Sequence, residues 1–269
     1  MEMHELETAA REIRRSIVAT IARAKGGHMG ASLSEVDILT ALFFGFMRCD
    51  PAAPEDPERD RFILSKGHGS EGLYCSLAHR GYFPQAMLDD YLGHDSPLTI
   101  HPTRHTPGVE MNTGALGHGF SNAVGVALSA KKSGRRFRTF VLTGDGELQE
   151  GTNWEAAMAA AHFKLGNLVV IVDNNRLQLA DTVENTMRIE PLGRKFEAFG
   201  FEVRGVDGHS IGELLGVLGG LDYEGERPHA IIAHTVKGRG VSFMEGVPEW
   251  HHRIPTGEEA ARALEELSK

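Results

Sequence analysis

The sequence has little of several things that define whole classes of proteins. It has two cysteines in 269 residues, Cys49 and Cys75, and both lie in apolar surroundings without metal-ligand spacing. This excludes a disulfide framework and predicts buried thiols in a reducing compartment. Acidic residues outnumber Lys and Arg by 37 to 28, and a net charge of -9 argues against nucleic acid or an anionic membrane as a partner.

Long apolar runs are also lacking. No segment approaches the length of a membrane span, and residues 1–5 are acidic and lack the apolar core of a signal peptide. We therefore expect a cytoplasmic protein. Low-complexity stretches, internal repeats and a linker that would divide the chain are missing as well, so we expect residues 1–269 to form a single domain.

Strand-like apolar runs alternate along the chain with segments of helical periodicity. The pattern predicts strands at 61–65, 139–142, 168–172, 201–206 and 229–233, and helices at 5–24, 34–46, 70–80, 84–92, 121–131, 153–165, 192–199, 211–221 and 257–267. Residues 176–190 are predicted to be a loop. Such alternation indicates an α/β fold, with a mainly parallel sheet and helices on both faces.

Polar side chains follow two of the predicted strands. Asp145, between Gly144 and Gly146, follows the strand at 139–142, and Asn175 follows the strand at 168–172. The carboxyl ends of parallel strands joined by a helix lie at one edge of the sheet, where α/β proteins bind ligands. Carboxylate and amide oxygens suit Mg²⁺, and the two glycines let a diphosphate approach the backbone. A lone Gly-Asp-Gly is common in turns, but the pair of motifs predicts a site for a metal-bridged diphosphate.

Histidine is the outlier of the composition. Many of the fourteen histidines stand beside Gly or Pro in predicted loops, including those at 28, 68, 101, 118 and 209. A histidine at such a turn has fewer structural reasons to be there than one on a helix face, so several should line a site.

Six motifs, in the same order along the chain, resemble those of transketolase. They are GHMGASLS (27–34), ILSKGH (63–68), TPGVE (106–110), TGALG (113–117), GDGELQEG (144–151) and AHTVKG (233–238). The chain is most similar to the separate N-terminal subunit of split bacterial transketolases. The related deoxyxylulose-phosphate synthases share the GDG and Asn-Asn motifs but resemble it less, because the LSKGH and TGALG forms are of the transketolase type.

The resemblance implies thiamine diphosphate and Mg²⁺ as cofactors, with Ca²⁺ or Mn²⁺ as possible substitutes for Mg²⁺. The side chains of Asp145 and Asn175 and the backbone carbonyl of Leu177 would bind the metal. The residues that would contact the cofactor are His68, Gly114, Ala115, Leu116, Gly146, Glu147, Asn175 and His251. The residues that would face the sugar and move protons are His28, His101 and His251.

Several further positions have a structural alternative to a functional role or depart from the family. Glu150 and Glu155 would lie toward a subunit interface, although acids at a helix start are also favoured by the helix dipole. Lys237 and Arg239 are expected at the surface or in a substrate channel. His105, His118, Ala180-Asp181 and His252 differ from the usual family residues, and His252 replaces a glycine. These departures surround the sugar side and leave the metal ligands intact.

The resemblance also implies a partner. Transketolases complete their site with a pyrimidine domain, and the 269 residues leave no sequence for one. We expect that domain and the C-terminal domain on a separate chain, in an α₂β₂ transketolase that moves a two-carbon ketol unit from a ketose or its phosphate to an aldose. Three alternatives stay open: a component of another thiamine enzyme, either a two-carbon loader or a 2-oxoacid decarboxylase; a non-catalytic cofactor-binding scaffold; and a dinucleotide-binding protein, although no G-x-G-x-x-G motif follows a first strand.

Overall fold

A parallel sheet forms the centre of the molecule. The computed structural model describes residues 1–179 and 181–268, and within them it contains one five-stranded sheet in the order β1-β2-β3-β7-β6, with every neighbouring pair parallel. The strands are β1 (Arg61–Leu64), β2 (Thr139–Gly144), β3 (Leu168–Asn174), β6 (Glu202–Asp207) and β7 (His229–His234). The predicted parallel α/β fold is confirmed, and each predicted strand is found to within two residues of its expected bounds.

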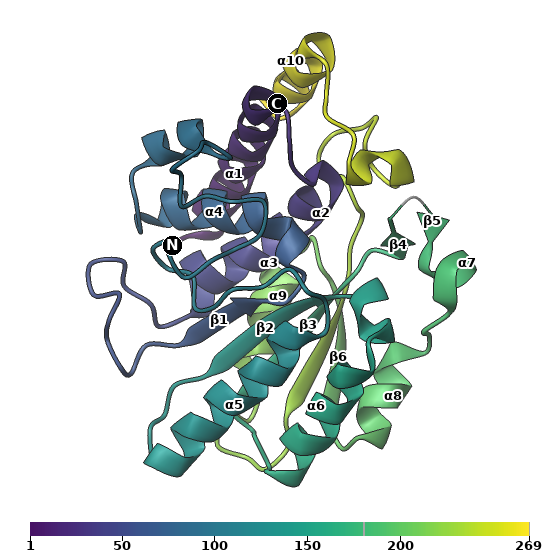
Figure 1. Cartoon of the computed structure of the whole chain (residues 1–269). Coiled ribbons are helices and arrows are strands. Elements are labelled where there is room, and N and C mark those ends of the chain that lie inside the picture. The colour runs from purple at the N-terminus through teal and green to yellow at the C-terminus, as the bar shows by residue number, and fades with distance from the viewer. Residues whose placement is uncertain (180, 269) are drawn as a thin grey trace.

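Helices cover both faces of this sheet (Figure 1). Side chains alternate along each strand, so Phe140 and Leu142 of β2 pack into one apolar cluster while Val141 packs into the other. The cluster around Val141 includes residues of α5 (His118–Ser133), α6 (Gly151–His162) and α8 (Leu192–Ala198). The opposite cluster includes residues of α1 (Met3–Ala24), α3 (Val36–Thr40), α4 (Ser70–Arg80), α9 (Ile211–Gly219) and α10 (Gly257–Glu266). Two buried apolar layers therefore hold the sheet rigid from both sides.

The second helical region begins earlier than predicted. We expect it from Ser34, but α2 runs over Met29–Ser34 and is followed by α3 and a π-helical turn, η1 (Ala41–Phe46). The carboxylate of Glu71 explains the early start, because it accepts hydrogen bonds from the backbone N–H of His28 (3.0 Å) and from the hydroxyl of Ser32 (2.7 Å). A contact from α4, distant in sequence, thus fixes the first turn of α2 and with it the position of His28.

The prediction that residues 176–190 form only a loop is wrong. This segment contains β4 (Leu177–Gln178) and β5 (Asp181–Thr182), which pair antiparallel, and the short helix α7 (Val183–Met187). The side-chain amides of Gln149 and Gln178 exchange hydrogen bonds of 2.7 and 3.0 Å and attach the hairpin to the loop after β2. Two-residue strands have no periodicity to read, and Ala180 between them lies outside the described residues.

Short 3₁₀ helices complete the fold at η2 (Gly67–Gly69), η3 (Gln85–Asp90), η4 (Gly146–Gln149) and η5 (Pro248–His251). Both cysteines are free and buried, as predicted. Across residues 1–179 and 181–268, the helices lack the combination of length and apolarity that crossing a membrane requires.

Candidate functional site

The two predicted metal ligands lie together at the carboxyl edge of the sheet. β2 and β3 are neighbours, so Asp145 and Asn175 follow adjacent strand ends. The Asp145 carboxylate accepts hydrogen bonds from the backbone N–H of Gly146 (2.7 Å) and of Arg176 (2.5 Å), the residue after Asn175. The Asn175 side-chain oxygen accepts one from the N–H of Leu177 (3.0 Å). Burial, with a contribution from the nearby Asp173, raises the pKa of Asp145 to about 7. A cation at this carboxylate would favour its ionised form.

A cavity of about 360 Å³ opens beside this pair. Its walls come from the residues that follow β1, β2, β3 and β7, from the start of α2 with His28 before it, and from the long segment that precedes α5. Among the described residues, its lining includes the predicted site residues His28, His68, His101, Gly114, Leu116, Asp145, Gly146, Glu147, Asn175, Leu177 and His251, but not Ala115. One cavity therefore brings together residues predicted separately for metal, cofactor and sugar.

Glycine at position 114 is required by the packing of the cavity wall. Gly114 has φ +139°, and an added Cβ would lie 2.9 Å from the ring of His101. Gly67 is equally constrained, because its Cβ would lie 2.6 Å from the backbone nitrogen of Gly114. The absence of these side chains keeps the wall thin and flat, which is the shape needed to seat a planar ring.

Lys237 lies in the wall of the cavity, which agrees with the channel position expected for it and not with a position at the surface. Only 2% of its surface is exposed, and its ammonium group lies 2.8 Å from Nδ1 of His251. Burial and the nearby Lys66 lower the pKa of Lys237 to about 8. In the described part of the chain no carboxylate forms an ion pair with it. A buried ammonium without a counterion, facing a cavity, fits an anionic ligand. Arg239, by contrast, is exposed as expected.

A buried ionic cluster, which we did not predict, lies under the cavity. The ammonium of Lys66 contacts the carboxylates of Asp173 (2.5 Å) and Glu35 (2.9 Å), and Asp173 also accepts a hydrogen bond from Ser34 (2.6 Å). Burial raises the pKa of Glu35 to about 8, while Lys66 keeps the pKa of Asp173 below its ordinary value against the effect of burial. Lys66 closely follows a strand, and Asp173 directly precedes Asn174-Asn175, which are the only sequence signals for this cluster.

Glu147 holds three loops together. Its carboxylate accepts hydrogen bonds from the Ser65 hydroxyl, from the N–H of Gly117 (2.9 Å) and from the N–H of Gly144 (3.0 Å). The residue is predicted to contact the cofactor, and it does line the cavity. Because its oxygens already bind protein donors, its observed contacts are with the loops that carry the other site residues.

Four histidines of the cavity, His28, His68, His101 and His251, are uncharged near neutral pH. Burial is the main cause, with neighbouring cations and imidazoles adding to it for most of them: the pKa of His28 falls to about 4 and that of His251 to about 3, and the pKa values of His68 and His101 are also lowered. A neutral imidazole has one donor and one acceptor nitrogen, so it can take a proton from one hydroxyl and give one to another.

The remaining predicted positions include several exposed ones. Glu150 is the N-cap residue of α6, and both it and Glu155, one turn later, are exposed. His105, His118 and Asp181 are exposed as well. His252, another departure from the family pattern, lines the cavity beside His251. Among the departures that lie in the described residues, His252 is therefore the one that the structure brings to the cavity.

The fold is a parallel sheet covered on both faces. Its site has an acid and an amide at adjacent strand ends and a buried ammonium that faces the same cavity. Together they define an α/β domain for an anionic cofactor. Comparison with known proteins gives the family. The model of the transketolase thiamine diphosphate binding domain matches residues 6–267, and the chain belongs to this family.

Relatives and solved structures agree with the assignment. The chain is 52% identical over 265 residues, 98% of its length and 96% of the relative's, to a subunit of the apulose-4-phosphate transketolase of Actinobacillus succinogenes. It is 39% identical to a 6-deoxy-6-sulfo-D-fructose transketolase subunit of a Clostridium species, covering 98% and 97% of the two chains. The crystal structure of transketolase from Campylobacter jejuni superposes with a TM-score of 0.93 at 32% identity, and this chain covers 43% of that protein.

Proposed function

We propose that this chain is the cofactor-binding subunit of a two-subunit transketolase, and that its donor is a phosphorylated ketose. The observation that carries the proposal is the cavity in which a metal-ligand pair, a buried ammonium and four neutral imidazoles converge. Apulose-4-phosphate is the first donor to test, because the relative of that name is 52% identical and 96% covered. The 6-deoxy-6-sulfo-ketose of the Clostridium relative is the second.

The residues present fit a metal-bridged diphosphate. Asp145, Asn175 and the backbone carbonyl of Leu177 would hold Mg²⁺, and the ammonium of Lys237 would neutralise diphosphate charge that the metal leaves. His68 and His251 would donate hydrogen bonds to the same group. The thin wall at Gly114, with Leu116 beside it, would receive the cofactor's rings. When bound, thiamine diphosphate supplies the electron sink for breaking and forming the carbon–carbon bond.

The histidines on the open side of the cavity would handle the substrate. Nδ1 of His28 is buried and lacks a hydrogen-bond partner among the described residues. An unpartnered ring nitrogen costs free energy unless a ligand satisfies it. His28 and His101 would bind the donor's hydroxyls and accept or return their protons, and His251 would orient both the diphosphate and the sugar.

The partner would be a second chain that carries the pyrimidine domain, and we propose an α₂β₂ complex. The 52% identical relative is itself named as one subunit of its transketolase, which supports a two-chain enzyme. Glu150 and Glu155 at the start of α6 are the residues of this chain that we place at the contact between the sites.

Co-expression with the neighbouring reading frame tests the proposal. The purified complex should transfer a two-carbon unit from apulose-4-phosphate to an aldose phosphate only when Mg²⁺ and thiamine diphosphate are present, and the isolated chain should not. Asp145→Asn in the same complex is the matched control and should abolish the metal-dependent activity. Robust turnover by the isolated chain, or decarboxylation of 2-oxoacids with no ketol transfer to any aldose, would refute it.

A further inference from the structure

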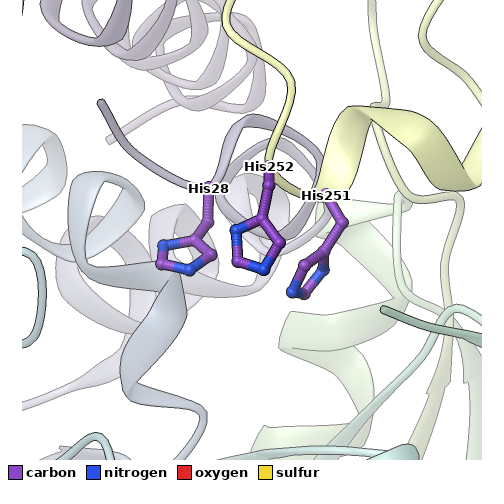
Figure 2. A group of neighbouring side chains, drawn as sticks. All are labelled: His28, His251 and His252. Carbon is purple, nitrogen blue, oxygen red and sulfur yellow. The ribbon is translucent and has the colours of Figure 1, made fainter. Parts of the chain in front are cut away.

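Three imidazoles converge at the mouth of the cavity. One ring nitrogen of each of His28, His251 and His252 lies within 4.8 Å of the others. The ring centroid of His252 lies 4.9 Å from that of His28 and 4.3 Å from that of His251. Figure 2 shows the rings side by side, His28 coming from the segment before α2 and the other two from the end of η5. Segments far apart in the sequence thus present their nitrogens to one small volume.

The surrounding charge decides what such a cluster binds. Three histidines at this spacing could hold a transition metal, but the ammonium of Lys237 lies 2.8 Å from Nδ1 of His251, and the buried Lys66 lies near enough to lower the pKa of His251 as well. Like charges repel more strongly inside a protein than in water, and a divalent cation would be repelled more than a singly charged one. A neutral ligand rich in hydroxyls is therefore favoured over a cation.

His252 is free to bind such a ligand. Its neighbours His28 and His251 are only 7% and 8% exposed, whereas His252 is exposed at the mouth. Within the described residues its side chain makes ring contacts with those two histidines but no hydrogen bond to the protein. Its backbone is fixed, since it follows η5 directly after the buried Trp250 and His251, and its N–H donates a hydrogen bond to the carbonyl of Glu249. A fixed backbone with an uncommitted ring describes a residue placed for a ligand.

We propose that His252 is a specificity-determining residue that, opposite His28, hydrogen-bonds one hydroxyl of the ketose donor. This is the hydroxyl next to the carbonyl on the side that is released, not the one on the transferred two-carbon unit. This rests on the proposed function, because the hydroxyl belongs to a donor bound over the cofactor. The ring both narrows the mouth and adds a second hydrogen-bonding nitrogen beside the unpartnered Nδ1 of His28. Donors that present a hydroxyl to this pair are accepted, and donors without it gain nothing from His252.

The test compares two donors in the two-subunit complex. Apulose-4-phosphate has the hydroxyl, whereas hydroxypyruvate has a carboxylate in place of the hydroxyl-bearing carbon. For His252→Gly we expect kcat/KM to fall about 10-fold or more on the ketose phosphate, the value of one hydrogen bond, and to stay within about 2-fold on hydroxypyruvate. His252→Asn keeps a donor group and should recover part of the loss.

Two controls make the outcome decisive. His162→Asn, at the far end of α6 from the cavity, should leave both donors unchanged. The affinity for thiamine diphosphate, measured by calorimetry, should be the same in wild type and both His252 variants. Equal losses on the two donors, or a weakened cofactor, would overturn the role of His252 while leaving the proposed function intact. A wild-type complex inactive on both donors would instead refute the proposed function.

Discussion

Replacing Lys237 by methionine should change stability and cofactor binding in opposite directions. Methionine has a similar unbranched shape but no charge. Lys237 is buried. Lys66 is already the counterion of Asp173, and Glu35, whose pKa is raised to about 8, is largely protonated near neutral pH. Attraction to Asp173 and Asp145 does not fully offset the burial of the Lys237 ammonium in the folded protein without cofactor, and the variant removes this cost.

The magnitude follows from the pKa. A Lys237 pKa lowered from 10.5 to about 8 corresponds to about 3 kcal/mol of folded-state destabilisation at neutral pH. Losing the hydrogen bond to His251 returns about 1 kcal/mol. The net gain of about 2 kcal/mol should raise the melting temperature of the isolated chain by roughly 4–8 °C. Cofactor binding should weaken by about 10- to 100-fold, because a hydrogen bond to a charged group contributes about 1.5–3 kcal/mol.

Thermal unfolding of the isolated chain measures the first effect, and calorimetry of thiamine diphosphate with Mg²⁺ in the two-subunit complex measures the second. Arg239→Met, at an exposed site two residues away, should leave both quantities nearly unchanged. If Lys237→Met bound the cofactor as tightly as wild type, the ammonium would not face the diphosphate. If it lost stability, Lys237 would be a structural cation and the reasoning from its missing counterion would be wrong.

Three further predictions concern pH and shape. The affinity of the complex for Mg²⁺ and thiamine diphosphate should rise about tenfold per pH unit up to about pH 7, where Asp145 ionises, and decline above about pH 8, where Lys237 loses its charge. Calorimetry from about pH 5.5 to 9 measures this profile. In Asp145→Asn the rise of affinity below pH 7 should be absent. Gly114→Ala should lower the free energy of unfolding by about 1–3 kcal/mol, because of the φ of +139° and the clash of the new Cβ with His101, and it should weaken cofactor binding. Gly125→Ala, where a Cβ would meet open space, should be tolerated in the same unfolding and binding assays. The pKa of Glu35 is raised to about 8 in the folded protein, so its protonated form stabilises the fold fully below pH 4.5, and this stability is lost as pH rises through about 8. Glu35→Gln cannot ionise. In urea unfolding the variant should therefore be more stable than wild type at about pH 9 and similar to it at about pH 5.

Local pattern was enough to predict the sheet and the strand ends. Val169 to Val172 form an uninterrupted apolar run, as expected for a strand covered on both faces, and such a strand leading to Asn175 could be paired with the one leading to Asp145 from the sequence alone. The early start of α2 and the β4–β5 hairpin could not be predicted. Both depend on contacts from distant segments, Glu71 in the first case and Gln149 in the second.

The site divides in the same way. Motif residues such as His28, His68 and Asp145 were predicted and do line one cavity. The ion pair of Lys66 with Glu35 and the burial of Lys237 were missed, because a charged residue normally lies at the surface and its neighbours in the chain do not show whether a cavity or an opposite charge lies beside it. Burial is a property of the assembled fold, and a single sequence carries it only indirectly.

The carboxylate of Glu147, which joins the loops of Ser65, Gly117 and Gly144, has a thermodynamic consequence for recognition. Loops tied to one another before any ligand arrives have already given up their conformational freedom during folding. Docking then requires few torsions to be frozen, and the binding entropy reflects released water more than ordered chain. Calorimetric titrations of this cradle should accordingly show the small heat-capacity change of a rigid receptor, without the large one that accompanies the folding of a loop.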